Sequence, residues 1–199
     1  NLDSKGGCFI PHGASLYKNP DGSESTLNYK DGKLNGRSYS YSAKKVLLSE
    51  ENFLNSLKDG KQKTFYEDGK KRSQEVYSAG LKVGEHLSWY PKGEIEKKVN
   101  YTDGHPSGTW TFWYPNGKKK SESAYGTLGW EGLYRDWYSS DRLHLVAQYV
   151  NGQLEGTYTL FYPNGKKEFF SSKGLVEKAG FYFFLSNPLM SIQRILMKS

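Results

Sequence analysis

One stretch of the chain decides the fold: Gly108-Thr109-Trp110-Thr111-Phe112-Trp113-Tyr114-Pro115-Asn116-Gly117-Lys118. Its first half is aromatic and β-branched, a composition typical of a pleated and partly buried strand. It then reaches Asn116-Gly117, a dipeptide that favours a two-residue hairpin in which both central residues have positive φ. The stretch therefore predicts a β-strand that runs into a hairpin turn.

The same features recur along the chain at a fixed step of 24 residues. Such a period is the signature of a repeat protein, in which each unit stacks on the next. The glycine recurs at Gly36, Gly60, Gly84, Gly108, Gly132, Gly156 and Gly180. We expect these glycines to need a positive φ or a close approach of neighbouring strands.

Each unit also has a more polar second half that keeps an alternating pattern, as in the segment from Ile95 to Tyr101. A second turn follows it, for example Asp103-Gly104 or Asn151-Gly152. Two strands and two turns per unit predict an all-β fold. The expected architecture is an elongated single antiparallel meander sheet of tandem β-hairpin repeats of 24 residues.

The repeat pattern also sets the expected domain boundaries. Residues 1–12 form an N-terminal extension, 13–180 the repeat array, and 181–199 a C-terminal strand with a short helical cap. The repeat pattern is degenerate in the first copy, residues 13–29, and weak at 44–57. The turn at 139–141 lacks glycine. The expected cap has one apolar stripe, made of Leu189, Ile192, Ile195 and Leu196.

Composition limits the classes of function. The chain has 28 Lys and Arg against 21 Asp and Glu, a formal charge of +7, and a mean hydropathy of −0.78. No apolar run predicts a transmembrane helix. The single cysteine, Cys8, predicts neither an internal disulfide nor a metal framework. The chain does not begin with methionine, so we expect any targeting signal to be hidden, and the compartment stays open between cytoplasm and cell envelope.

Lysines follow the hairpin turns at corresponding positions in several units. In a regular meander they form a rim along one sheet edge, which attracts an acidic protein surface or anionic lipid. The alternative is a solvated edge that only aids solubility. Nucleic acid is the least supported partner, because no recognised binding module accompanies the charge. The rim residues are Lys70, Lys71, Lys118, Lys119, Lys166 and Lys167.

Aromatic residues form rows on both faces of the expected sheet, because successive side chains in a strand point to opposite faces. The row Trp89, Trp113, Trp137 and Phe161 shares one face, which we expect to be core. The opposite face carries more hydroxyls, which tolerate water, so we expect it to be the more accessible face and to bind a partner. The alternative is that both faces are core. The expected binding residues are Trp110, Tyr134, Tyr158, Tyr90, Tyr114, Tyr138 and Tyr162.

No catalytic centre is expected. The four histidines occupy unrelated repeat positions without metal-ligand spacing, and no phosphate-binding loop is present. Pairs of acids such as Glu94 with Glu96 and Glu50 with Glu51 are typical of exposed strand ends. We expect no catalytic residue, no metal and no cofactor.

The segments Tyr101 to Lys118 and Tyr149 to Lys166 follow the pattern Y-x-x-G-x-x-x-G-x-x-x-x-[WF]-Y-P-x-G. This pattern resembles the variant MORN repeat, closely over residues 77–170 and weakly over 13–76. The resemblance implies a twisted antiparallel sheet of hairpins and a binding role without catalytic residues. Bacterial proteins of this variant are commonly labelled antitoxins, and eukaryotic relatives of the ordinary repeat are scaffolds associated with membranes.

These observations lead to one main hypothesis. The protein is expected to be a non-catalytic protein-interaction module, antitoxin-like or immunity-like, which uses the aromatic face and the lysine rim. The alternative is a cell-envelope protein that contacts anionic lipid or glycan. The third hypothesis is a hydrolase whose catalytic residues the sequence does not reveal.

Overall fold

The computed structural model describes residues 10–172, 175–178 and 181–184, and at 156–158 and from 168 onward it describes the backbone alone. These residues form nineteen strands and no helix. They divide into two compact units, residues 1–95 with 101–105 and residues 96–100 with 106–199. The expected helical cap and Cys8 lie outside the described residues. The expected division into extension, array and cap therefore stays a prediction, although β1 does begin at Gly13.

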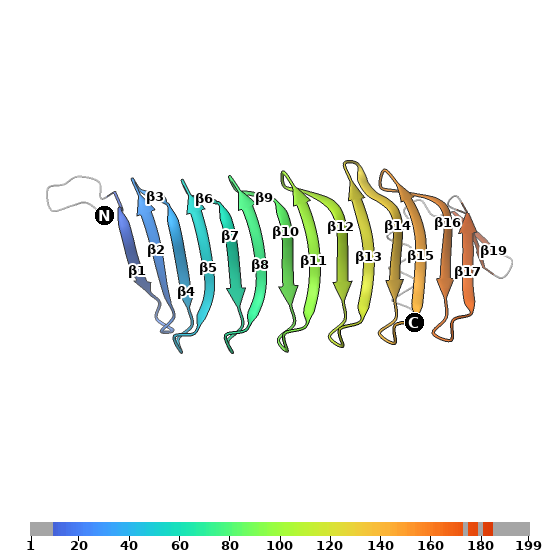
Figure 1. Cartoon of the computed structure of the whole chain (residues 1–199), viewed down its shortest axis with the longest axis horizontal. Helices are drawn as coiled ribbons and strands as arrows, with labels where there is room; N and C mark the ends of the chain where they lie inside the picture. The colour runs from blue at the N-terminus through green and yellow to red at the C-terminus, as the bar shows by residue number, and fades with distance from the viewer. Residues whose placement is uncertain (1–9, 173–174, 179–180, 185–199) are drawn as a thin grey trace. The chain divides into compact units, whose positions relative to one another are not determined.

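The first unit is an antiparallel meander of hairpins that lie side by side in one layer (Figure 1). Its long strands pair in chain order, β1 with β2, β2 with β4, β4 with β5, β5 with β7, β7 with β8, and β8 with β10. Its strands are β1 (Gly13–Lys18), β2 (Glu24–Lys30), β3 (Lys33–Leu34), β4 (Gly36–Tyr41), β5 (Leu47–Leu54), β6 (Leu57–Lys58), β7 (Gly60–Phe65), β8 (Lys71–Ser78), β9 (Leu81–Lys82) and β10 (Gly84–Trp89).

The second unit has the same construction. Strand β11 (Ile95–Thr102) contributes residues to both units, and from β12 onward each strand pairs antiparallel with the next. The remaining strands are β12 (His105–Trp113), β13 (Lys119–Gly126), β14 (Gly129–Trp137), β15 (Leu143–Val150), β16 (Gln153–Phe161), β17 (Lys167–Ser172), β18 (Leu175–Lys178) and β19 (Phe181–Phe184). The predicted all-β antiparallel meander of hairpin repeats is confirmed.

Two kinds of turn alternate along each meander, and Figure 1 shows them at opposite ends of the strands. The tight turns have two central residues, both with positive φ, such as Asp103 (48°) with Gly104 (81°) and Asn151 (51°) with Gly152 (76°). The strand pair Val150 and Gln153 closes the second example directly. These are type I′ turns, whose twist matches that of the flanking strands.

The wide turns differ from the sequence prediction at Asn116-Gly117 and Asn164-Gly165. Only the glycine has positive φ, 77° at Gly117, while Asn116 does not. The Gly117 amide donates to the Tyr114 carbonyl (2.9 Å), so residues 114–117 form a type I turn with glycine in the left-handed position. The Asn116 side chain instead accepts a bond from the Lys118 amide (3.0 Å). The prediction that both residues need positive φ was therefore wrong here.

The glycines of the 24-residue step mark a second irregularity in each repeat. Gly36, Gly60, Gly84, Gly108 and Gly132 have φ values from 59° to 90°. Around Gly132 the register between β13 and β14 shifts, which is the behaviour of a β-bulge. A side chain would meet nothing within 4 Å at Gly84 and Gly132 and only ordinary contacts at the other three, so the left-handed backbone rather than crowding requires the residue type. The expectation of positive φ is confirmed for these five positions.

Candidate interaction site

The second unit carries a group of cations at its wide turns, which we call the basic edge. Its members are Lys118, Lys119, Lys120, Arg142, Lys166 and Lys167. Lys119 is half-buried and the others are exposed. The nearby acids are Asp141 in the middle turn, Glu122 on β13, Asp136 near the end of β14, where it lies 2.8 Å from His144, and Glu168, which follows Lys167 in the sequence. The basic edge therefore keeps a net positive charge.

Hydrogen bonds from two of these cations to backbone carbonyls connect neighbouring wide turns. The Lys118 Nζ donates to the Ser140 carbonyl of the next turn (3.1 Å), and Arg142 donates to the Pro163 carbonyl (2.6 Å). Carbonyl contacts leave the positive charge uncompensated, unlike an ion pair. The turns are thus linked, and their cations remain available to an acidic surface.

Aromatic rings lie beneath the strand-end lysines. The Lys119 Nζ is 5.4 Å from the Trp137 ring centroid and 2.7 Å from a Glu122 carboxylate oxygen. The Lys120 Nζ is 5.7 Å from the Tyr114 ring centroid. Contacts of this geometry are worth about 0.5–1 kcal/mol at exposed sites and restrict the side chain. Of these two lysines, Lys119 is partly neutralised by the Glu122 carboxylate, whereas Lys120 lies over the Tyr114 ring.

The predicted rim lysines of the first unit lie in a more balanced setting. The Lys70 Nζ is 2.9 Å from Asp68, and Lys71 lies over the Trp89 ring at 5.8 Å. The wide turns of this unit also carry Asp21, Glu67 and Glu94. The same repeat position is therefore basic in both units, and in each unit an acid pairs with one of its lysines, Asp68 with Lys70 and Glu122 with Lys119.

Three tyrosines of the 24-residue step use their hydroxyls inside the protein. Each described pair joins a tyrosine hydroxyl to the backbone carbonyl at the end of the corresponding strand one repeat later. The pairs are Tyr66 with Trp89 (2.7 Å), Tyr114 with Trp137 (2.8 Å) and Tyr138 with Phe161 (2.8 Å). Tyr90 is half-buried, and Tyr162 is 44% exposed. Tyr66, Tyr114 and Tyr138 therefore link repeats, and the expected role in binding of Tyr90, Tyr114, Tyr138 and Tyr162 stays a prediction.

The face that carries Trp110 and Tyr134 is the more buried one, which corrects the expected accessibility. Tyr134 pairs directly with Ala147, which belongs to the buried core with Leu145 and Tyr149. Burial raises the pKa of Tyr134 and raises the pKa of Tyr149 to about 12. The expectation of an accessible face failed because the aromatic rings cover one another on this side of the sheet.

Trp110 has a structural contact that the sequence did not reveal. Its Nε1 donates to the Asn100 carbonyl (2.9 Å), and its ring lies 4.6 Å from the Tyr125 ring. One and two repeats earlier, His86 and Gln62 make the corresponding contact with a backbone carbonyl (2.9 Å each). The side chain at this repeat position therefore hydrogen-bonds a backbone carbonyl of the neighbouring strand in both units.

Tyr158, the last expected binding residue, can be placed only by its backbone. It pairs with Ala147 across β15 and β16. It therefore shares the face of Tyr134, while its side chain lies outside the described residues. Its expected role in binding stays a prediction.

Trp130 and a row of asparagines were missed by the sequence reasoning. Trp130 stacks on Tyr134 (5.1 Å between centroids) and meets Tyr149 edge-on (4.8 Å). It occupies the repeat position of Lys82, which lies over the Tyr101 ring at 5.2 Å in the first unit. The asparagines recur at the 24-residue step and donate across the bulge, as Asn28 to Arg37, Asn52 to Lys61 and Asn100 to Thr109. That recurrence is visible in the sequence.

His86 is a buried titratable group, 2% exposed, on the corresponding face of the first unit. Its ring lies 4.8 Å from the Tyr101 ring, and its Nδ1 is 3.8 Å from a Glu75 oxygen. Burial lowers the pKa of His86 and outweighs the opposing effect of the Glu75 carboxylate. A neutral histidine whose Nε2 donates to the Val76 carbonyl (2.9 Å) is a structural group.

Of the acids that are paired in sequence, Glu50 and Glu51 form ion pairs, whereas the buried Oε2 atom of Glu94 has no hydrogen-bond partner among the described residues. Glu50 binds Lys63 (2.9 Å), and Glu51 binds Lys58 (2.8 Å). In the part of the chain that the structure describes, no group of three or more His, Cys, Asp or Glu is arranged to hold a metal ion. The described ranges also contain no helix of the length and apolarity needed to cross a membrane.

Comparison with known proteins supplies the family. A family model described as the MORN repeat variant matches residues 58–79, 82–103, 106–125 and 154–169. Repeats of this family are generally interaction or membrane-binding modules, and the family is non-enzymatic. No curated protein matches the chain. The matched segments include the wide turns at residues 114–118 and 162–166 described above, and the chain belongs to the MORN-repeat family in its variant form.

Proposed function

We propose that this protein is a non-catalytic protein-interaction module whose basic edge binds an acidic surface of a partner protein. The observation that carries the proposal is the charge of the second unit's wide turns. Six cations lie there, and they outnumber the four nearby acids Glu122, Asp136, Asp141 and Glu168. Exposed charges of one sign raise the rate at which an oppositely charged partner associates.

The aromatic rings beside these cations add a second contribution. Trp137 lies beneath Lys119, and Tyr114 lies beneath Lys120. Both rings are half-buried, so part of each is open to contact. Aromatic and arginine side chains are enriched among the residues that dominate interfaces. We propose that Tyr114 and Tyr138 contribute by linking neighbouring strand ends of this edge, and that Trp110 and Tyr134 contribute by packing within the sheet.

The finer form of the proposal is an antitoxin-like or immunity-like binder. Such a protein acts by occupying a surface of its partner, which needs shape and charge but no catalytic group. The family resemblance supports this form, and an acidic partner matches the charge of the basic edge. The partner is defined here by its acidic surface.

Co-purification of charge-reversed variants tests the proposal. The triple variant Lys118→Glu, Lys120→Glu and Lys166→Glu reverses the basic edge, and these three lysines are exposed. The matched control reverses the exposed Lys30, Lys33 and Lys61 of the first unit, which changes the net charge equally. We expect a partner, identified by mass spectrometry, to be retained by the wild type and the control and lost by the basic-edge variant. Equal retention by all three proteins contradicts the proposal.

A second candidate function, contact with an anionic membrane, is favoured by the same Lys119 and Trp137 pair. Cationic and aromatic side chains together suit the interface of an anionic bilayer. Sedimentation with phosphatidylserine vesicles separates the two functions. Binding to vesicles that the basic-edge variant loses supports the membrane function, whereas no binding to vesicles supports the protein partner.

A further inference from the structure

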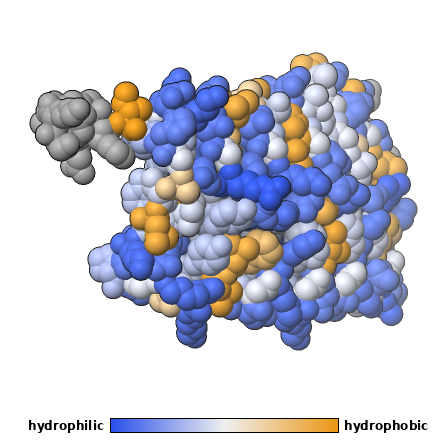
Figure 2. Space-filling model, turned by 60° about the vertical axis from the view of Figure 1, so that its left-hand side comes forward, coloured by the Kyte–Doolittle hydropathy of each residue, from blue (hydrophilic) through white to orange (hydrophobic). Residues whose placement is uncertain are grey.

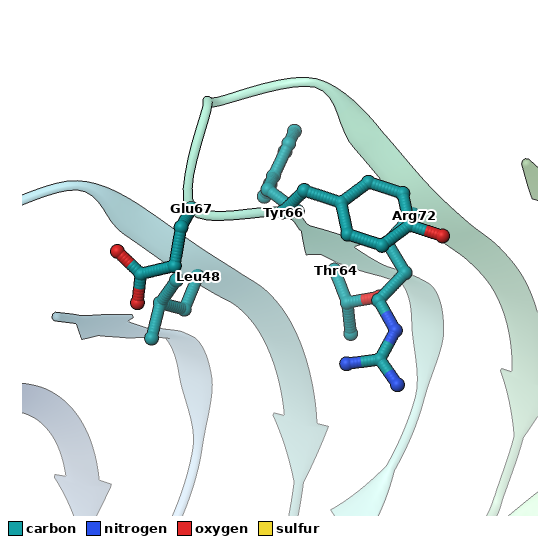
Figure 3. Close-up of a pocket in the computed structure, with 6 residues that line it drawn as sticks. Leu48, Thr64, Tyr66, Glu67 and Arg72 are labelled. Carbon is teal, nitrogen blue, oxygen red and sulfur yellow. The ribbon is translucent and has the colours of Figure 1, made fainter. Parts of the chain in front are cut away.

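We propose that a cavity beside Tyr66 in the first unit is a binding pocket for a tyrosine side chain of a partner protein. The cavity measures about 310 Å³ and is lined by Leu48, Thr64, Phe65, Tyr66, Glu67 and Arg72. Figure 3 shows Leu48 and Glu67 on one side of it and Tyr66 with Arg72 on the other. The size lies at the lower end of ligand pockets, which suits a single ring.

The cavity lies where one tyrosine of the 24-residue step is missing. Tyr66 follows Gly60 by six residues, as Tyr114 follows Gly108, but six residues after Gly36 the chain has Ser42. The backbone at Ser42 matches that at Tyr66, because the Ser42 amide donates to Val46 (2.9 Å) as the Tyr66 amide donates to Lys70 (2.8 Å). The side chain of a tyrosine at position 42 would therefore leave the backbone in the same direction as that of Tyr66.

The contacts of Tyr66 show what such a ring would touch. Tyr66 donates its hydroxyl to the Trp89 carbonyl (2.7 Å), and its ring lies 5.9 Å from the Arg72 guanidinium. One repeat earlier the equivalent positions are Phe65 and Leu48. Both line the cavity, so the space is the one that a ring from position 42 would fill.

The occupant's chemistry follows from this comparison. The ring needs an apolar edge against Leu48 and a hydroxyl donor aimed at the Phe65 carbonyl. Arg72 also lines the cavity and offers its guanidinium to a ring face, and guanidinium groups bind ring faces well. A phenol satisfies all three, whereas an aliphatic side chain satisfies one.

This inference rests on the proposed function only in taking the phenol as part of a partner protein. The surface in Figure 2 is mostly hydrophilic, with apolar residues in small separate patches. A defined pocket for one aromatic anchor therefore supplies the specificity that a charged edge lacks.

Titration with p-cresol, the isolated tyrosine side chain, tests the pocket without any partner. We expect saturable NMR shifts at the amides of Leu48, Thr64 to Glu67 and Arg72. Toluene lacks the hydroxyl, so its affinity should be about fivefold lower, the factor of one neutral hydrogen bond. Shifts at other residues, or equal affinity for the two compounds, overturn the pocket.

The variant Ser42→Tyr fills the space from within. We expect it to abolish p-cresol binding and to raise the melting temperature, whereas Ser139→Tyr, at an exposed turn position, should bind p-cresol as the wild type does. Persistent binding to Ser42→Tyr overturns the inference. If that variant does not fold, the wild-type titration with the two compounds decides alone. Failure of the pocket leaves charge-dependent binding at the basic edge intact, so the two proposals fail separately.

Discussion

Trp110 distinguishes a structural role from a binding role on the aromatic face of the second unit. The ring is mostly buried, and its Nε1 donates to the Asn100 carbonyl (2.9 Å). Truncation of a fully buried aromatic costs about 3–5 kcal/mol, so we assign about 2 kcal/mol to this partly exposed ring. The hydrogen bond contributes about 1 kcal/mol. The variant Trp110→Ala should therefore lose about 3 kcal/mol of unfolding free energy.

Two further variants separate these contributions. Gln62 occupies the same repeat position and donates to the Asn52 carbonyl (2.9 Å), so Trp110→Gln keeps a donor and removes the ring. Trp110→Phe keeps most of the ring and removes the donor. We expect losses of about 2 kcal/mol for Gln and about 1 kcal/mol for Phe.

Urea denaturation followed by circular dichroism measures these losses. Amide hydrogen exchange near Asn100 locates them, because repeat arrays open locally. If Trp110→Ala stays within about 0.5 kcal/mol of the wild type and loses partner binding, Trp110 is a docking residue and the structural reasoning is refuted.

Two other substitutions test single features of the fold. Burial depresses the pKa of His86. Below pH about 6.5 the unfolded chain therefore takes up a proton that the folded chain does not. The stability that is present above this pH is lost as the pH falls through the folded pKa. His86→Gln should remove this loss, of at most about 1.4 kcal/mol per pH unit; denaturation at several pH values checks it, and an unchanged slope contradicts it. Asp141 has a φ of 76° at the position that Gly117 occupies in a neighbouring wide turn. Because glycine adopts positive φ without strain, Asp141→Gly should stabilise the protein by about 0.5–1 kcal/mol. A lowered melting temperature of this variant would contradict the prediction.

The strand and turn order was predictable because the 24-residue step repeats every local signal. Glycine at Gly108 predicted a left-handed backbone, and the structure gives it φ of 59°. The wide turn was mistaken because Asn116-Gly117 was interpreted without Pro115. Proline is favoured at the second position of a type I turn, which leaves the asparagine right-handed and free to cap the Lys118 amide.

The candidate site was only partly predictable. The positions of Lys118 and Lys166 after each turn follow from the repeat. The contacts that hold the edge do not, because Ser140 and Pro163 contribute backbone carbonyls that carry no residue-specific signal. The accessibility of the two faces also depends on how rings such as Trp130 pack, and an isolated strand pattern does not contain that information.

The association rate of the purified partner with the basic-edge variant tests the central claim most directly. Stopped-flow measurements at about 50 mM and about 200 mM salt compare the wild type, the basic-edge variant and the control that reverses Lys30, Lys33 and Lys61. We predict that the basic-edge variant associates at least about tenfold more slowly than the other two at low salt, and that the difference shrinks at high salt. Equal rates for the three proteins at both salt concentrations would contradict the account.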